Sequence, residues 1–293
     1  MEKEIIEKYV KAGLIAKQAR EYGVKLIKDG ARALDIAEAV ERKIRELGGE
    51  IAFPTNISIN DLAAHYTPIQ NDPLIIKNED YVKLDLGVHI DGYIADTAIT
   101  IRPAGKDKLI ECSEKMLEAG LNAIKPGITL GEIGEIIENI AKQYGFKSII
   151  NLSGHGLDKF NLHAGKLVYN VKNNNKYIIK EGEVYAIEPF CTTGAGSVKD
   201  SGKALIFKFM KDVPIRNPDA RKILELAKTK WFGLPFARRW IKLSTIKKEF
   251  LLKQLISMNA IHAYLPLREV SNAPVAQTEH TVIVLEKPII TTI

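Results

Sequence analysis

The feature that most constrains the fold of this chain is an internal repeat, because a chain that contains one unit twice is expected to fold as two related halves. Residues 28–49 align without a gap with residues 125–146, and the glycines near both ends coincide. Apolar residues at helical spacing predict one helix in each segment, ended by Gly48 and by Gly145. Amphipathic helices could match by chance at their apolar positions, but the paired glycines favour duplication.

The repeat extends into a strand. Residues 80–87 resemble residues 183–190 after a small change of offset, and Asp85 then aligns with Glu188. A duplicated α-β unit would place these two acids at related positions on one shared sheet. Because paired halves often hold a ligand set at their junction, we expect a site there. A further helix, predicted over 4–24, should cover one face of the sheet together with the first helix of the repeat.

A hairpin predicted at residues 83–97 carries two acids on one face. Asp91 and Gly92 form the strongest short signal for a two-residue turn between two apolar strands. In that register Asp85 and Asp96 are diagonal neighbours, with Cα atoms roughly 7–8 Å apart. Two such carboxylates repel each other unless a proton or a cation lies between them. Taken alone, the hairpin fits either half of a metal site or two solvent-facing acids.

Three further side chains extend this pattern. Glu188 ends an apolar strand, and Glu279 precedes a β-branched strand over 281–285. His155 lies between two glycines, where a turn residue is more usual than a ligand. Four carboxylates and one imidazole suit hard to borderline divalent ions. They are too many for one catalytic zinc, but they suit two ions about 3.5–4 Å apart, which hydrolyse an amide or a phosphate.

Composition and charge narrow the class of protein. The chain has 293 residues, of which 46% are hydrophobic and 27% charged, as in an ordinary globular protein. No apolar run reaches the length of a membrane span, and the charged start does not resemble a signal peptide. Cys112 and Cys191 match no zinc spacing and form no disulfide framework. We expect a cytoplasmic enzyme that does not bind membranes.

A basic segment interrupts the second half. Residues 208–253 contain 13 Lys and Arg against four acids, a balance of +9 that exceeds the net charge of +6 for the whole chain. Asn217 predicts a helix start, and helical patterns cover 221–231 and 245–258. We expect a catalytic domain of 1–207 plus 263–293, and a basic, mostly helical insertion of 208–262. A solvated helical face is the more frequent meaning of such charge.

The motifs DGYIADTA, SGHG, IEPF and QTEHT resemble, in this order, those of the methionine aminopeptidases of the pita-bread fold. The likeness covers essentially the whole chain. The stretch AFPTNISINDLAAHYTP and the late insertion resemble the type 2, archaeal-like branch. The resemblance implies an α+β fold in which pseudo-twofold duplicated halves surround a curved antiparallel sheet. It also implies a hydroxide, activated by two divalent ions (Co, Mn, Fe or Zn), that removes the initiator methionine from peptides and nascent proteins.

The same resemblance implies a role for each site residue. Asp85 would bind one ion, His155 and Glu188 the other, and Asp96 and Glu279 would bridge both. Glu188 would also shuttle the proton to the leaving amine. The two further catalytic side chains, which would position the substrate, are His65 and His163. The methionine pocket would be lined by Phe53, Leu162, Phe190, Tyr264 and Leu267. One departure is the stretch YLPL at 264–267, which has leucine where type 2 relatives commonly carry a second proline.

Two rival functions remain on the sequence alone. Xaa-Pro peptidases share the fold but usually carry an additional N-terminal domain, for which the position of Ala52 leaves no room. Non-catalytic pita-bread proteins that bind nucleic acid or ribosomes have lost metal ligands, whereas all five are present here. We therefore expect a monomeric enzyme whose partners are chains beginning with Met and, through the basic insertion, the ribosome.

Overall fold

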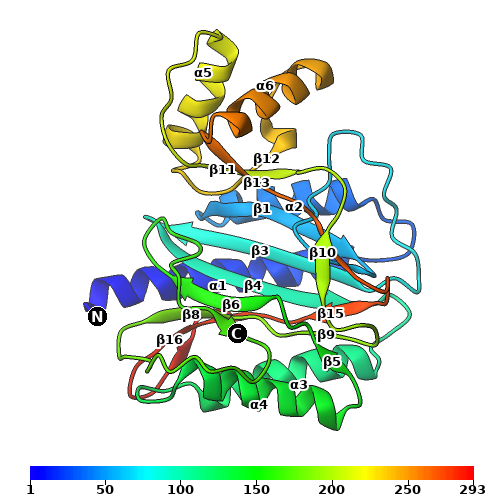
Figure 1. Cartoon of the computed structure of the whole chain (residues 1–293), viewed down its shortest axis with the longest axis vertical. Helices are drawn as coiled ribbons and strands as arrows, with labels where there is room; N and C mark the ends of the chain where they lie inside the picture. The colour runs from blue at the N-terminus through cyan, green and yellow to red at the C-terminus, as the bar shows by residue number, and fades with distance from the viewer.

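The first half of the chain is a helical layer on a three-stranded antiparallel sheet. The computed structural model describes all residues 1–293. The sheet has the order β1-β3-β4, and α1 and α2 pack on one of its faces (Figure 1). The core between the two layers is apolar and includes Ile36, Val40 and Leu84. The elements are α1 (Lys3–Leu26), α2 (Ala33–Glu46), β1 (Glu50–Ile59), β3 (Val82–Ile90) and β4 (Tyr93–Ile101).

The second half repeats this plan. Helices α3 (Lys108–Ala123) and α4 (Leu130–Gln143) pack together beneath the strands of this half (Figure 1). Its sheet has the order β17-β16-β8-β6-β7. The strands are β6 (Ser153–Leu157), β7 (Val168–Tyr169), β8 (Val184–Ile187), β16 (His280–Ile283) and β17 (Ile289–Ile290).

The backbone confirms the duplication. Helices α2 and α4 begin and end at matching positions of the repeat. The N–H of Gly30 donates to the carbonyl of Ile76, and the N–H of Gly127 donates to that of Ile179, both at 2.9 Å. Both glycines have positive φ, 79° and 96°, so each repeat enters its helix through the same left-handed turn.

The hairpin register is confirmed, whereas the expected single sheet is divided. Asp85 pairs with Ala98 across β3 and β4, and Asp96 pairs with Gly87, which puts both acids on one face. The two halves have separate sheets, because no continuous strand ladder joins them. They meet at one antiparallel bridge between Ala98 and Glu279. The two halves are therefore joined at the predicted site.

The structure corrects the prediction for His155, which lies in strand β6 rather than in a turn. Its two glycines serve close strand contacts: a Cβ on Gly154 would lie 2.3 Å from the carbonyl oxygen of Ala186. Two smaller sheets flank this region, with the orders β10-β14-β2 and β15-β9-β5. Their strands are β2 (Leu62–Ala64), β5 (Lys147–Ser148), β9 (Phe190–Thr192), β10 (Val198–Asp200), β14 (Leu267–Glu269) and β15 (Val275–Gln277).

The basic segment forms a compact unit above the sheets, with an apolar core of its own (Figure 1). Asn217 caps its first helix, as predicted. The pattern over 221–231 is only partly α-helical, because α5 ends at Glu225 and the chain continues as a π-helix over Leu226–Lys230. The remaining elements are β11 (Ile206–Phe209), α5 (Pro218–Glu225), β12 (Phe236–Ala237), a 3-10 turn (Arg238–Trp240), α6 (Thr245–Ser257) and β13 (Ile261–Tyr264).

A buried ion pair fastens this unit to the first half. Arg239 forms a salt bridge with Glu41 of α2, and both side chains are almost fully buried. The indole of Trp240 donates to the same carboxylate at 3.0 Å, and the backbone N–H of Thr55 donates to it at 3.2 Å. Because this carboxylate is fully paired, its burial is tolerated. The pair fixes the insertion relative to β1, which forms one side of the site.

Two remaining observations concern the chain as a whole. Cys112 and Cys191 are both free and buried. None of the helices combines the length and the apolar character needed to cross a bilayer.

Candidate active site and metal centre

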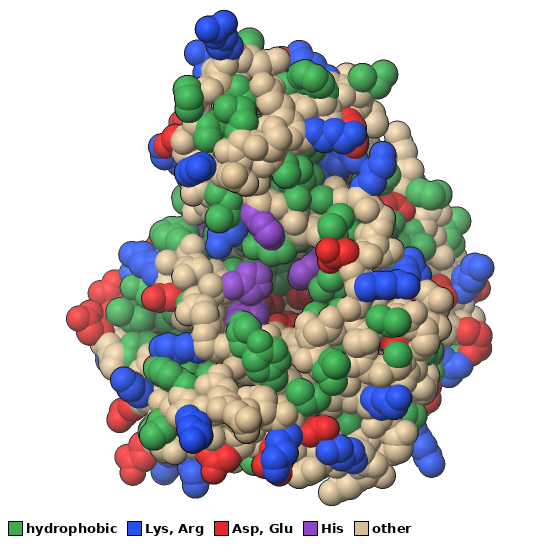
Figure 2. All heavy atoms as spheres, viewed as in Figure 1, with side chains coloured by type: hydrophobic (Ala, Val, Ile, Leu, Met, Phe, Trp, Pro, Cys, Tyr) green, Lys and Arg blue, Asp and Glu red, His purple; other side chains and the backbone are tan.

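A cavity of about 480 Å³ opens between the two halves and beneath the insertion. In Figure 2 histidines surround the hollow and acidic side chains lie in its depth. The cavity is lined by Phe53, Asn56, Ala64, His65, Asp85, Asp96, His155, Leu162, His163, Glu188, Ile206, Pro235, Tyr264 and Glu279.

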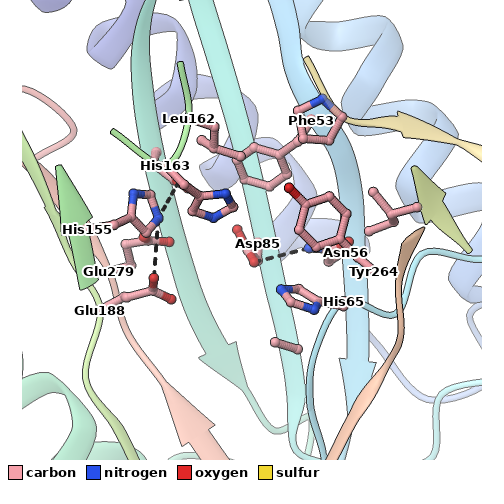
Figure 3. A pocket seen from close by; sticks show the side chains of 14 residues that line it. Phe53, Asn56, His65, Asp85, His155, Leu162, His163, Glu188, Tyr264 and Glu279 are labelled. Carbon is pink, nitrogen blue, oxygen red and sulfur yellow. Dashed lines mark hydrogen bonds and ion pairs between the residues drawn. The ribbon is translucent and has the colours of Figure 1, made fainter. Parts of the chain in front are cut away.

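The structure brings together all five side chains that the sequence singled out as metal ligands (Figure 3). Nε2 of His155 lies 3.8 Å from Oδ2 of Asp96 and 3.4 Å from Oε1 of Glu188. One ligand atom each of Asp96, His155 and Glu279 lie within 4.8 Å of one another. These three side chains could therefore hold a metal ion between them.

The strands explain why these carboxylates converge. Asp85 and Asp96 extend from the same face of the hairpin, and the register between β8 and β16 places Glu188 beside Glu279. Asp96 and Glu279 are 3% and 1% exposed. The side chains thus cannot separate without breaking strand pairing.

Burial keeps His155 neutral, and the ring directs its Nε2 atom toward the acids. Burial lowers the pKa of this ring to about 4. Its Nδ1 lies 3.4 Å from the carbonyl of Gly156, and a carbonyl can only accept a hydrogen bond. Nδ1 therefore carries the proton and Nε2 keeps its lone pair. A neutral imidazole whose second nitrogen is held by the backbone is the usual form of a histidine metal ligand.

The four carboxyl groups lack compensating charge. Burial raises the pKa of Asp85 to about 7. Burial, followed by repulsion from the neighbouring acids, holds the pKa values of Asp96, Glu188 and Glu279 well above the ordinary range. One oxygen each of Asp85 and Asp96 has no hydrogen-bond partner. The side-chain amide of Asn56 donates to Asp85 at 3.2 Å, and that of Gln277 donates to Glu188 at 3.4 Å. Such a cluster fits divalent cations, which would replace the protons.

The two predicted substrate-positioning histidines line the same cavity. The ring of His163 lies 4.5 Å from that of His155, and the ring of His65 lies 5.5 Å from that of Tyr264. Nδ1 of His65 is 3.2 Å from the carbonyl of Leu265 and must donate to it, so Nε2 is the accepting nitrogen of the neutral ring. Burial lowers the pKa of His65 and brings that of His163 to about 2.

The expected methionine pocket is only partly assembled. Phe53, Leu162 and Tyr264 line the cavity. Phe190 and Leu267 do not; they pack in a neighbouring apolar cluster that includes Ala64. Ala64 itself lines the cavity, so Phe190 and Leu267 lie in the cluster behind its wall. Their contact with substrate stays a prediction.

The sequence reasoning missed several lining residues. Asn56 lies opposite Asp85 across β1 and β3, and a polar residue facing an acid in an apolar strand was a signal that could have revealed it. Ile206 and Pro235 come from the insertion and its base. Ordinary apolar residues that reach the cavity through long-range contacts leave no signal in the sequence.

The comparison with known proteins agrees with this geometry. Metallopeptidase family M24 matches residues 7–218, which is well over half of the chain, so the chain belongs to this family. Among its relatives is the methionine aminopeptidase of Thermococcus onnurineus, which is 48% identical over 95% of this chain and 96% of its own length. The resemblance to methionine aminopeptidases is thereby confirmed.

Solved structures that share the fold include the two that follow. A thermophilic Arx1 has a TM-score of 0.88 and 19% identity, covering 99% of this chain and 91% of its own. The methionine aminopeptidase of Thermotoga maritima has a TM-score of 0.72 and 22% identity, covering 100% and 98%. At these identities the likeness concerns the fold, and it confirms the expected α+β pita-bread architecture.

Metal binding should release protons. At about pH 6.5 the metal-free cluster retains protons because its carboxyl pKa values are raised, and a bound cation would drive them off. We expect Mn²⁺ to release about one proton or more per molecule, measured by titration calorimetry in buffers of different ionisation enthalpy. The release should decrease in Asp85→Asn, which removes one carboxyl group and its repulsion. Release of no protons would show that the empty site is already fully ionised.

Proposed function

We propose that this chain is a metalloaminopeptidase that removes the N-terminal methionine from peptides and nascent proteins. The observation that carries the proposal is a set of three buried carboxylates, a fourth that is partly buried (Glu188), and one neutral histidine, all lining one cavity. The relatives named methionine aminopeptidase support it. They do not favour the two rivals, an Xaa-Pro peptidase or a non-catalytic binding protein.

The donor set fits two divalent ions. In this proposal Asp85 would hold one ion, His155 and Glu188 would hold the other, and Asp96 and Glu279 would serve both. Carboxylate oxygens and an imidazole nitrogen suit Co, Mn, Fe or Zn and do not discriminate sharply among them. When bound, such ions supply a water of lowered pKa and a positive charge near the developing oxyanion.

The surrounding side chains would handle the substrate. Glu188 has a raised pKa and lies at the edge of the cluster, so its carboxyl group is suited to carry a proton to the leaving amine. His65, whose Nε2 accepts, can take a hydrogen bond from a peptide N–H, and His163 adds a second imidazole. Phe53, Leu162 and Tyr264 form the apolar wall that suits a thioether side chain.

The substrate can be tested directly. Protein reconstituted with Mn²⁺ or Co²⁺ should release free methionine from peptides of the Met-Ala-Ser type. It should not release methionine from the same peptides after N-acetylation, because the free amino group is part of the recognised end. Chromatography of the products distinguishes the alternatives. Cleavage of Xaa-Pro dipeptides instead would favour the first rival, and no turnover with any divalent ion would favour the second.

Asp96 should be indispensable. Asp96→Asn keeps the size of the side chain but removes a charge that both ions are proposed to share. Turnover should fall by at least about 100-fold and metal affinity should weaken, since a bridging ligand is lost. Peptide kinetics and calorimetric metal titration provide the measurements. A fully active variant would contradict the bridging role.

We further propose that residues 208–262 act as a separate subdomain that docks on ribosomal RNA and holds this monomeric, cytoplasmic enzyme near emerging chains. Lys222, Lys230 and Lys242 are among the lysines of this subdomain that form no ion pair, unlike Lys228, Lys247 and Lys253. The three unpaired lysines named here line a cavity of about 710 Å³ together with Trp231 and Trp240. Unpaired cations beside aromatic rings match the chemistry of phosphates and unstacked bases.

Ribosome docking can be tested by charge reversal. Changing Lys222, Lys230 and Lys242 to Glu should abolish co-sedimentation with ribosomes at low salt, while release of methionine from short peptides continues. The matched control reverses three exposed, unpaired lysines of the first half, Lys11, Lys25 and Lys28. Equal loss in both triple variants would indicate general electrostatic attraction. Unchanged binding in the test variant would overturn the docking proposal.

A further inference from the structure

The strands that carry the two proposed bridging carboxylates are tied together by buried threonines. The hydroxyl of Thr97 donates to the backbone carbonyl of Glu279 at 2.9 Å. In the opposite direction, the hydroxyl of Thr281 donates to the carbonyl of Asp96 at 2.8 Å. Both threonines are completely buried. Each hydroxyl therefore fixes the backbone from which the carboxylate on the other strand extends.

Arg20 of α1 reaches this junction from behind the metal cluster. One terminal nitrogen of its guanidinium donates to the hydroxyl of Thr97 and lies 3.3 Å from Nδ1 of His280. The other donates to the carbonyl of Thr292 at 3.0 Å. Arg20 lines a different cavity from the one that holds the acids. It therefore has no direct access to a substrate.

The guanidinium determines the direction of the threonine bond. A hydroxyl has one proton, and arginine can only donate. With Arg20 donating to its oxygen, the hydroxyl of Thr97 is left to give its proton to the carbonyl of Glu279. The same nitrogen faces His280, the residue that follows Glu279. One cation thus contacts both strands, each at the residue directly after a proposed bridging carboxylate.

Pairing of the two strands does not require this arrangement. The backbones of Ala98 and Glu279 already exchange two hydrogen bonds, of 3.3 and 2.9 Å. An apolar pair would fill the space behind them without burying a charge, and burial does lower the pKa of Arg20. A partly buried arginine with three directed contacts adds geometric precision to the junction. The side chains that benefit are Asp96 and Glu279.

We propose that Arg20 and Thr97 are positioning residues of the metal centre, which fix the separation and orientation of the carboxylates of Asp96 and Glu279. The inference rests on the proposed function only in assigning these two carboxylates to the metal. Residues that orient metal ligands typically change metal affinity by about 10–100-fold when they are mutated. Arg20 and Thr97 should act in this range although neither touches the metal.

The test is metal affinity, measured by calorimetric titration of the metal-free protein with Mn²⁺. Thr97→Val removes the hydroxyl at nearly constant volume, and Arg20→Met removes the cation while retaining an apolar stem. Each should weaken Mn²⁺ binding by about 10–100-fold. Thr97→Ser, which keeps the hydroxyl, should restore most of the affinity. Arg20→Lys should not, because a single ammonium cannot reproduce the forked contacts.

A matched control separates positioning from general stability. Thr192 is also completely buried; its hydroxyl donates to the carbonyl of Pro274 at 2.7 Å and accepts from the N–H of Gly194 at 3.0 Å. Thr192→Val therefore loses a comparable pair of bonds away from the acids. It should lower the unfolding temperature of the metal-free protein about as much as Thr97→Val, yet leave Mn²⁺ affinity unchanged.

The outcomes distinguish the positioning role of Arg20 and Thr97 from the proposed aminopeptidase function. Equal loss of affinity in Thr192→Val, or normal affinity in both Arg20→Met and Thr97→Val, would overturn the positioning role. If Thr97→Val does not fold, Arg20→Met and the serine variant still decide the question. Metal affinity is measured without peptide. A wild-type protein that binds Mn²⁺ but releases no methionine would refute the proposed function and leave the positioning role standing.

Discussion

Mutual repulsion among buried carboxylates is the constraint on which the rest of this structure depends. Asp85, Asp96, Glu188 and Glu279 share one cavity, and each extends from or directly beside a paired strand. Because the strands cannot move apart without losing their hydrogen bonds, the repulsion is not relieved by relaxation. It is relieved by protons or by cations. The fold therefore stores the free energy that makes cation binding favourable, and the proposed positioning role of Arg20 and Thr97 would keep the ligands from adjusting.

Duplication supplies the frame, and the insertion breaks its symmetry. Glu41 and Glu138 occupy the same position in the two copies of the repeat. Glu138 accepts from the backbone of Lys172 at 3.0 Å, whereas Glu41 is paired with Arg239 of the insertion. The same position of the repeat thus contacts a surface loop in one half and anchors the insertion in the other. That unit brings Pro235 to the cavity wall, so the symmetric frame holds the cluster and the insertion shapes the substrate side.

Predictions that depended on contacts between residues close in sequence were more accurate than those that depended on contacts between distant segments. The hairpin register depended on a two-residue turn and was predicted correctly, as were the helices of the repeat. The position of His155 in a strand was not predicted, because the glycines beside it mark close strand contacts made with a distant segment. Phe190 is apolar and aromatic, as a residue of a methionine pocket would be. Long-range packing nevertheless places it in a neighbouring cluster. Roles of single apolar side chains depend on such contacts, which periodicity does not encode.

The histidines and the acids of the site are shifted in opposite directions by the same burial. The pKa of His155 falls to about 4 while that of Asp85 rises to about 7. Between these values the metal-free site holds neutral imidazole beside protonated carboxyl groups, so it carries less charge than either group would have in water. A cation entering this site meets a free lone pair on His155 and competes only with carboxyl protons. Burial therefore keeps the charge of the metal-free site low, which lowers its free energy. It also leaves the imidazole of His155 neutral and able to bind a cation.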